Sequence, residues 1–138
     1  MKIAVFSSEA VPFAKTGGMA DVCGALPLAL KKLGHDVIII MPKYKQVLDN
    51  GIKLKKVGPD ILLSKENGIK AYFIEHEHYF HRPGLYGEKA GDYPDNLERF
   101  SHYSRRALEA LKEIDFKADI IHCHDWQSAL AIIYLKNI

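Results

Sequence analysis

The chain has 138 residues, 48% of them hydrophobic, and its nineteen basic and seventeen acidic residues leave a formal net charge of +2. This length allows one hydrophobic core, so we expect a single domain or part of one. Because the charges are dispersed and nearly balanced, the composition argues against nucleic acid and against a membrane surface as partners.

Cysteine content and hydropathy indicate the compartment. Cys23 and Cys123 are too few for a disulfide framework, and we interpret both as small buried thiols. The first segment is a charged strand without a long apolar run, which argues against a signal or transit peptide, and no later stretch is apolar enough to span a bilayer. We therefore expect a cytoplasmic protein.

The first elements are a strand, a helix and a second strand. Residues 2–6 form a short apolar strand, and over 19–33 apolar residues recur with helical period. Pro27 lies inside this pattern, so we expect a kink or a new helix start there. After a turn at 34–36, the continuous apolar run at 37–41 is typical of a strand covered on both faces. This order predicts a parallel pair with a right-handed crossover.

The middle of the chain carries weaker strand signals. Short apolar runs at 52–54, 61–63 and 69–75 are separated by Gly-Pro and Asn-Gly turns, which predicts a hairpin inserted into the sheet. Residues 76–92 are polar, aromatic and glycine-rich. A loop of this length in a compact domain is usually functional or mobile.

A helix, a strand and another helix complete the pattern. Over 94–114 one helical face is apolar, formed by Leu97, Phe100, Ala107, Leu108, Leu111 and Ile114. Residues 119–122 indicate a buried strand, and Asp125 the N-cap of a last helix that is apolar nearly all round. Such a helix needs covering on more than one side, so we expect an incomplete core at this end. The alternation predicts an α/β fold with a doubly wound, mostly parallel, Rossmann-like sheet.

The junction between the first strand and helix indicates a ligand site. Residues 15–22 are Lys-Thr-Gly-Gly-Met-Ala-Asp-Val, and Gly17 and Gly18 stand where the helix begins. Without a Cβ these residues let backbone N–H groups approach an anion, and Lys15 adds a positive charge. Asp21 is placed to accept hydrogen bonds from hydroxyl groups, so the pattern predicts a pocket for a phosphorylated sugar. It matches neither the dinucleotide fingerprint nor the P-loop, and a plain Gly-Gly turn before a helix is the alternative.

A second polar group follows the last predicted strand. His122 and His124 are two residues apart, so their side chains face the same way on a strand, and Asp125 follows. Such a pattern can ligate zinc, with further histidines at 76–81. The alternative is a hydrogen-bonded imidazole at the carboxyl end of a parallel strand, with His124 facing the ligand crevice. We interpret Trp126, which opens an apolar helix, as a core anchor rather than a sugar platform.

Several motifs carry a family resemblance. Residues 15–22, with Ser-Glu at 8–9 and Gly-Ala-Leu-Pro at 24–27, closely resemble the amino-terminal signature of bacterial glycogen synthases and plant starch synthases. His-Cys-His-Asp-Trp-Gln at 122–127 resembles that family's His-Ala-His-Asp-Trp-His segment, and Tyr-Pro-Asp-Asn at 93–96 its Tyr-x-Asp-Asn motif. The departures are small: Met19 replaces Leu, Cys123 replaces Ala and Gln127 replaces the last His.

The resemblance implies a fold, a reaction and a place in a longer chain. The fold is the two-domain GT-B glycosyltransferase architecture, and the reaction transfers glucose from ADP-glucose to the non-reducing end of an α-1,4-glucan with retention, without cofactor or catalytic metal. Residues 1–138 would be an incomplete amino-terminal, acceptor-side domain, nearly inactive without the carboxy-terminal nucleotide-binding domain. The alternatives are another GT-B nucleotide-sugar transferase and a metal-dependent hydrolase that uses His122 and His124.

The resemblance also implies roles for individual residues. The residues that position the transferred sugar are Asp21 and His124. Those that meet the donor phosphate are Lys15, Gly17 and Gly18. Those that face the glucan acceptor are Glu9, Tyr93 and Asn96.

Overall fold

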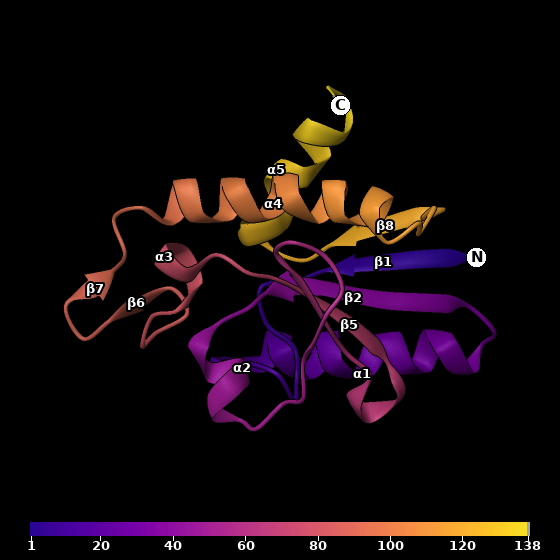
Figure 1. The fold of residues 1–138 in the computed structure, drawn as a ribbon, viewed down its shortest axis with the longest axis horizontal. Coiled ribbons are helices and arrows are strands. Elements are labelled where there is room, and N and C mark those ends of the chain that lie inside the picture. Colours follow the sequence, from indigo (N-terminus) through magenta and orange to yellow (C-terminus); the bar gives the residue numbers. More distant parts are fainter. Residues whose placement is uncertain (138) are drawn as a thin grey trace.

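A six-stranded sheet forms the centre of the computed structural model, which describes residues 1–137 (Figure 1). The strand order is β3-β4-β5-β2-β1-β8. The strands are β1 (Lys2–Phe6), β2 (Asp36–Pro42), β3 (Lys55–Lys56), β4 (Ile61–Ser64), β5 (Lys70–Ile74) and β8 (Ile120–Cys123). The pairs β1–β2, β1–β8 and β2–β5 are parallel, whereas β3 and β4 form an antiparallel edge. The predicted α/β class and mostly parallel sheet are confirmed.

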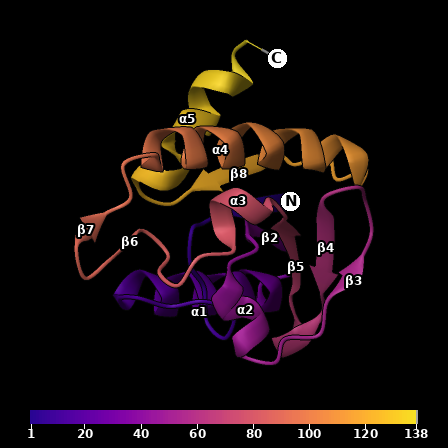
Figure 2. The same ribbon diagram turned by 60° about the vertical axis from the view of Figure 1, so that its left-hand side comes forward.

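Helices cover both faces of this sheet. They are α1 (Gly18–Lys32), α2 (Lys45–Asp49), α3 (Glu77–Phe80), α4 (Asn96–Glu113) and α5 (Trp126–Leu135). In Figures 1 and 2, α1 and α2 lie on one side of the sheet and α4 and α5 on the other. This arrangement is the doubly wound one that the alternation of elements predicts. None of the helices in residues 1–137 is long and apolar enough to cross a membrane.

The core is densest around β1 and β2. Residues 38–41 of β2 are at most 1% exposed, as the continuous apolar run predicts for a central strand. The structure contains the predicted hairpin, formed by β3 and β4. This hairpin lies at the edge of the sheet, and residues 52–54 do not form a strand. A strand forms near residues 119–122 as predicted, but it is not buried. β8 is the last strand of the sheet, and its Ile120 is 42% exposed.

Helix α1 begins where the glycine pair predicts, but the face that it buries is only partly the expected one. It continues through Pro27 as one helix, so the expected second helix start is wrong. Val22 and Leu33, expected on the apolar face, are 53% and 74% exposed. Cys23, which was expected on this face, is buried as predicted, and Ala20, Gly24 and Pro27 are buried with it. Gly24 explains the choice, because a Cβ there would lie 2.4 Å from Cγ2 of Val11, so only a glycine lets this loop approach the helix so closely.

The two predicted carboxy-terminal helices are present, but the exposure of Leu97 and of Trp126 differs from the prediction. Helix α4 buries most of its predicted face, but Leu97 is 69% exposed. Asp125 caps α5 as predicted, because its carboxylate accepts a hydrogen bond from the N–H of Trp126 at 2.7 Å. The Trp126 ring packs edge-on against Phe100, with ring centres 5.0 Å apart, but remains 49% exposed, so it is only half a core anchor.

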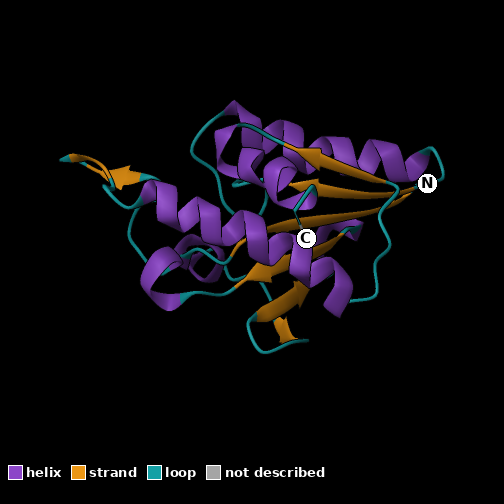
Figure 3. Ribbon diagram, turned by 90° about the horizontal axis from the view of Figure 1, so that it is seen from above, coloured by secondary structure: helices purple, strands orange, loops and turns teal. Residues whose placement is uncertain are grey.

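The segment 76–92 contains short elements of its own. Helix α3 is followed by a hairpin of β6 (Gly87–Glu88) and β7 (Gly91–Asp92), which projects from the rest of the molecule in Figure 3. The hairpin strands approach closely, since a Cβ at Gly87 would lie 2.4 Å from the carbonyl oxygen of Gly91.

Candidate functional site

The carboxyl end of β1 leads into a buried turn that is organised by Glu9. This side chain is 3% exposed. Its carboxylate accepts hydrogen bonds from the backbone N–H groups of Thr16 and Gly17 and from the Thr16 hydroxyl, the last at 2.9 Å. Glu9 therefore faces the turn that precedes α1.

The start of α1 is open. Gly17 is the N-cap in an extended conformation, with no side chain capping the helix, and a Cβ at Gly17 or Gly18 would meet nothing within 4 Å. The N–H groups of Gly18 and Met19 come too early in the helix to bond within it, and no acceptor for them lies among residues 1–137. Two N–H groups and the positive end of the helix dipole are thus available to an anion.

Lys15 and Asp21, both predicted for the site, form an ion pair. The Lys15 ammonium lies 2.7 Å from each Asp21 carboxylate oxygen. Both side chains are about half exposed, at 50% and 57%. An exposed pair of this kind contributes on the order of 0–1 kcal/mol, so a ligand can separate it at little cost.

Tyr86, which the sequence reasoning missed, joins the loop to this turn. Its hydroxyl donates to Glu9 Oε1 at 3.0 Å and lies 2.7 Å from Ser8 Oγ. Burial raises the pKa of the Tyr86 phenol, so the group stays protonated and remains a donor. The one sequence signal for it is its place in the aromatic, glycine-rich segment 76–92.

Tyr93 is held by several polar groups rather than free to stack on a sugar. The guanidinium groups of Arg82 and Arg99 lie 4.8 and 4.9 Å from its ring centre. Its hydroxyl donates to Glu88 at 2.8 Å and accepts from the N–H of Gly84 at 3.2 Å. Burial, followed by the bond to Glu88, raises the pKa of Tyr93.

Asn96 is likewise engaged within the protein. Its amide donates to the Tyr86 carbonyl at 2.8 Å and accepts from Arg99 at 2.6 Å. Arg99 is fully buried and also donates to the carbonyl oxygens of Tyr79 and Leu85, at 2.8 and 2.9 Å. Burial lowers the pKa of the Arg99 guanidinium. The sequence analysis did not predict that Arg99 holds the loop. The signal was an arginine next to Phe100, a residue of the predicted apolar face, because an arginine at such a position indicates a buried polar contact.

His122 and His124 lie together at the carboxyl end of β8. Their rings stack with centres 4.2 Å apart, as two side chains on the same face of a strand. The His124 backbone N–H donates to the Phe6 carbonyl at 2.9 Å, which ties it to the carboxyl end of β1. Burial, followed by His122, lowers the pKa of the His124 imidazole, and its buried Nε2 finds no hydrogen-bond partner in the described part of the chain.

The predicted residues fall into one connected group and two separate parts. Contacts join Glu9 and Gly17 to Asn96 through Tyr86. The Lys15–Asp21 pair lies beside this group, at the start of α1. Within residues 1–137, no hydrogen bond or ion pair joins the His124 side chain to either, and no group of three or more His, Cys, Asp or Glu is placed to hold a metal ion.

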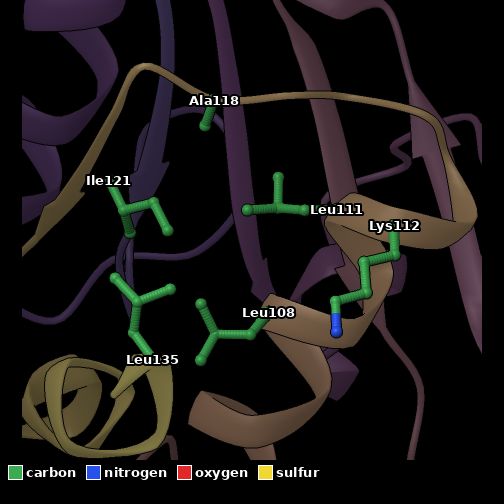
Figure 4. Close-up of a pocket in the computed structure, with 6 residues that line it drawn as sticks. All are labelled: Leu108, Leu111, Lys112, Ala118, Ile121 and Leu135. Atoms are coloured by element: carbon green, nitrogen blue, oxygen red, sulfur yellow. The ribbon is translucent and has the colours of Figure 1, made fainter. Parts of the chain in front are cut away.

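Two of the hollows, one beside α5 and one at the β6–β7 hairpin, both lie away from the start of α1. An apolar one of about 210 Å³ lies between α4, β8 and α5 and contains no predicted site residue (Figure 4). Its lining is Leu108, Leu111, Lys112, Ala118, Ile121 and Leu135. The other, open and about 510 Å³, lies at the β6–β7 hairpin and includes Glu88, the partner of Tyr93.

The known proteins that this chain resembles are glycogen synthases and starch synthases. The family model "Starch synthase catalytic domain" matches residues 2–138. The chain is 46% identical to the glycogen synthase of Geotalea uraniireducens and 41% identical to glycogen synthase 2 of Geobacter sulfurreducens, in each case over 99% of this chain and 31% of the relative. The catalytic domain of starch synthase IV from Arabidopsis thaliana, bound to ADP and acarbose, matches with a TM-score of 0.81 and 35% identity, over 97% of this chain and 30% of that one. The chain thus spans about a third of the length of these relatives.

Proposed function

Since the chain belongs to the starch synthase catalytic domain family, we propose that it forms the acceptor-side part of a retaining glucosyltransferase. The reaction transfers glucose from ADP-glucose to the non-reducing 4-hydroxyl of an α-1,4-glucan. The observation that carries the proposal is the open start of α1, where two free N–H groups lie at the end of a turn that carries Lys15. We further propose that transfer requires the remaining length of the relatives, including their nucleotide-binding domain.

Lys15 and the start of α1 have the chemistry to stabilise the leaving group. As the bond between the sugar C1 and the diphosphate oxygen breaks, negative charge grows on ADP, and fixed N–H groups with a cation stabilise it without reorganising. The phosphate meets the N–H of Gly18, while Gly17, whose N–H is already bonded to Glu9, contributes the absence of a side chain. Lys15 leaves Asp21 to reach the phosphate, and the freed carboxylate accepts from a sugar hydroxyl.

His124 and the 76–96 segment serve the two sugars. The lowered pKa keeps His124 neutral at pH 7, and a turn of its ring brings the buried, unpartnered Nε2 to a hydroxyl of the transferred glucose, to which it can donate or from which it can accept. Tyr93 acts on the acceptor chiefly by holding Glu88 and Gly84, which line the hairpin hollow, and Asn96 acts by holding Tyr86 and Arg99. The acceptor hydroxyl oxygen bonds to C1 as the bond from C1 to the diphosphate oxygen breaks, its proton passes to that leaving phosphate oxygen, and ADP departs.

The choice of substrates rests on the comparisons. The Arabidopsis structure contains ADP and acarbose, which supports a nucleotide-sugar donor and a glucan acceptor for this chain. The comparisons do not favour the metal-dependent hydrolase. A GT-B transferase with a UDP- or GDP-sugar is the competing assignment, and the cytoplasm stays a prediction of the sequence.

A hybrid enzyme tests the function directly. In it, this chain replaces the matching 31% of the Geotalea uraniireducens glycogen synthase. We expect incorporation of labelled glucose into glycogen from ADP-glucose in preference to UDP- or GDP-glucose. Lys15→Gln should lower kcat/KM by on the order of 100-fold, the size expected when one fixed group that stabilises the leaving charge is lost.

Lys45→Gln is the matched control. Lys45 also pairs with an aspartate, Asp49, and these side chains are 44% and 55% exposed, much like the Lys15 pair. The Lys45→Gln variant should keep kcat/KM within about twofold of that of the unsubstituted hybrid, since an exposed ion pair contributes little. A hybrid that unfolds cooperatively but transfers no glucose contradicts the function. Equal effects of the two lysine variants contradict the role of Lys15. Transfer by the 138-residue chain alone contradicts the need for the remaining length.

A further inference from the structure

We propose that Glu9, with Tyr86, is a positioning residue that holds the turn before α1 in shape for the donor phosphate, and is not an acceptor-facing group. The proposal rests on the function proposed above, because it concerns the same phosphate site. It assigns Tyr86 a role that no sequence motif suggested.

The hydrogen-bonding capacity of Glu9 is fully used inside the protein. Oε2 accepts from the N–H groups of Thr16 and Gly17, Oε1 accepts from Tyr86, and the Thr16 hydroxyl lies within 3.0 Å of both oxygens. An ionised carboxylate offers about four acceptor sites, and four contacts to protein donors occupy them. At 3% exposure, Glu9 cannot bind a sugar hydroxyl without giving up one of these bonds.

Glu9 also decides which N–H groups remain for a ligand. By accepting from Thr16 and Gly17, it fixes two successive peptide groups just before the helix. The next two N–H groups, of Gly18 and Met19, then stand free at the helix start. Without the carboxylate, all four N–H groups would be unpaired and the turn could adopt other conformations, so the free pair would no longer be held in one place.

Tyr86 connects this turn to the segment that the family resemblance assigns to the glucan. Its hydroxyl bonds to Glu9 at 3.0 Å, while its carbonyl accepts from the N–H of Tyr93 at 2.9 Å and from the Asn96 amide at 2.8 Å. One residue therefore contacts both the phosphate turn and the segment 93–96. The same residue thus bonds to the phosphate turn through its side-chain hydroxyl and to the glucan segment through its backbone carbonyl.

Tyr86→Phe is the informative variant, because it removes one hydroxyl without changing charge. Changing Glu9 would also remove a negative charge beside the anion site, and the two effects would mix. Tyr134→Phe is the matched control: its hydroxyl also bonds to a serine, Ser101, at 2.6 Å, but between α4 and α5. Thr16→Val, at an exposed residue, is a second test that removes a different donor to Glu9 and leaves aromatic packing intact.

The measurement is amide hydrogen exchange by NMR on the 138-residue chain, followed by titration with inorganic pyrophosphate. We expect Tyr86→Phe and Thr16→Val to shift the Thr16 and Gly17 amide signals and to speed their exchange about tenfold, with the β2 amides unchanged. Pyrophosphate affinity should fall about three- to tenfold in both. Tyr134→Phe should match wild type in the turn and in affinity.

The outcomes separate this proposal from the function it rests on. It is overturned if the Thr16 and Gly17 amides do not respond, if the β2 amides exchange faster to the same degree, or if affinity is unchanged despite a local response. If wild type itself binds no pyrophosphate, the donor site proposed above fails. A local response of the two amides in that case still supports Glu9 and Tyr86 as the groups that hold the turn.

Discussion

The carboxyl end of β1 and the edge formed by β8 and α5 are neighbours in the fold, yet they are packed very differently. At the first, Phe6 and Ser8 are fully buried and Glu9 is 3% exposed. At the second, Ile120 and Ile133 are 42% and 57% exposed. The described residues thus bury a carboxylate in one region while leaving large apolar side chains in water in the other.

The difference shows what gives each region its order. Around β1, the buried charged groups have partners: Glu9 bonds to the turn, and Arg99 to carbonyl groups of the loop. Along β8 and α5, backbone pairing with β1 and the Asp125 cap supply the order, while the outer surface has no partner among residues 1–137. The candidate site is therefore built where buried polar bonds determine a single arrangement.

The largest expected effect comes from removing the buried charge of the first region. Arg99→Met leaves the carbonyl oxygens of Tyr79 and Leu85 and the Asn96 amide without their donor. We expect the free energy of unfolding in urea to fall by about 3 kcal/mol or more, the size expected for breaking a buried charged network. Arg105→Met, on the exposed face of the same helix, should change it by at most about 0.5 kcal/mol. Similar values for the two variants would mean that Arg99 does not fasten the loop.

A smaller loss is expected where α1 meets the loop after β1. Gly24→Ala brings a Cβ to 2.6 Å from the Val11 carbonyl oxygen, so the helix or the loop must move, at a cost of about 1–3 kcal/mol in the free energy of unfolding. Gly18→Ala, in the same helix but in open space, should not lower stability, because alanine is the better helix former. Thermal unfolding of the pair measures the contrast. Equal stabilities would show that the Val11 contact is not tight.

The smallest effect is expected on the outer face of α5. Ile133→Gln, at a residue that is 57% exposed, should change the free energy of unfolding by no more than about 0.5 kcal/mol. Ala131→Gln on the same helix, at 2% exposure, should cost at least about 1 kcal/mol by overpacking. Should Ile133→Gln cost as much as Ala131→Gln, this face is covered in solution, and sedimentation of the wild-type chain would reveal self-association.

Sequence patterns predicted the elements better than their faces. The strand at 2–6, the glycine-started helix and the Asp125 cap were all predicted, because each depends on residues close together in the chain. The buried face of α1 was not, since Val22 and Leu33 fit the helical period better than the small residue Gly24. Which face is buried depends on Val11, which approaches closely only at a glycine.

The site divides in the same way. Lys15, Gly17, Gly18 and Asp21 are close in sequence, and the local pattern alone placed them around one helix start. The orientation of Glu9 was not predicted, because no sequence pattern shows that its carboxylate bonds back to the nearby Thr16 and Gly17, and its bond to Tyr86 joins residues 77 positions apart.

By itself, then, the sequence determined the α/β alternation and the family, and it predicts an anion site at the start of α1; each of these depends on short segments of the chain. Only the tertiary structure decided that Glu9 turns inward, that Asn96 and Tyr93 are bonded within the protein, and that β8 is an exposed edge. The physical reason is that a buried polar group must find a partner, and a strand its neighbours, among whatever residues the folded chain brings near.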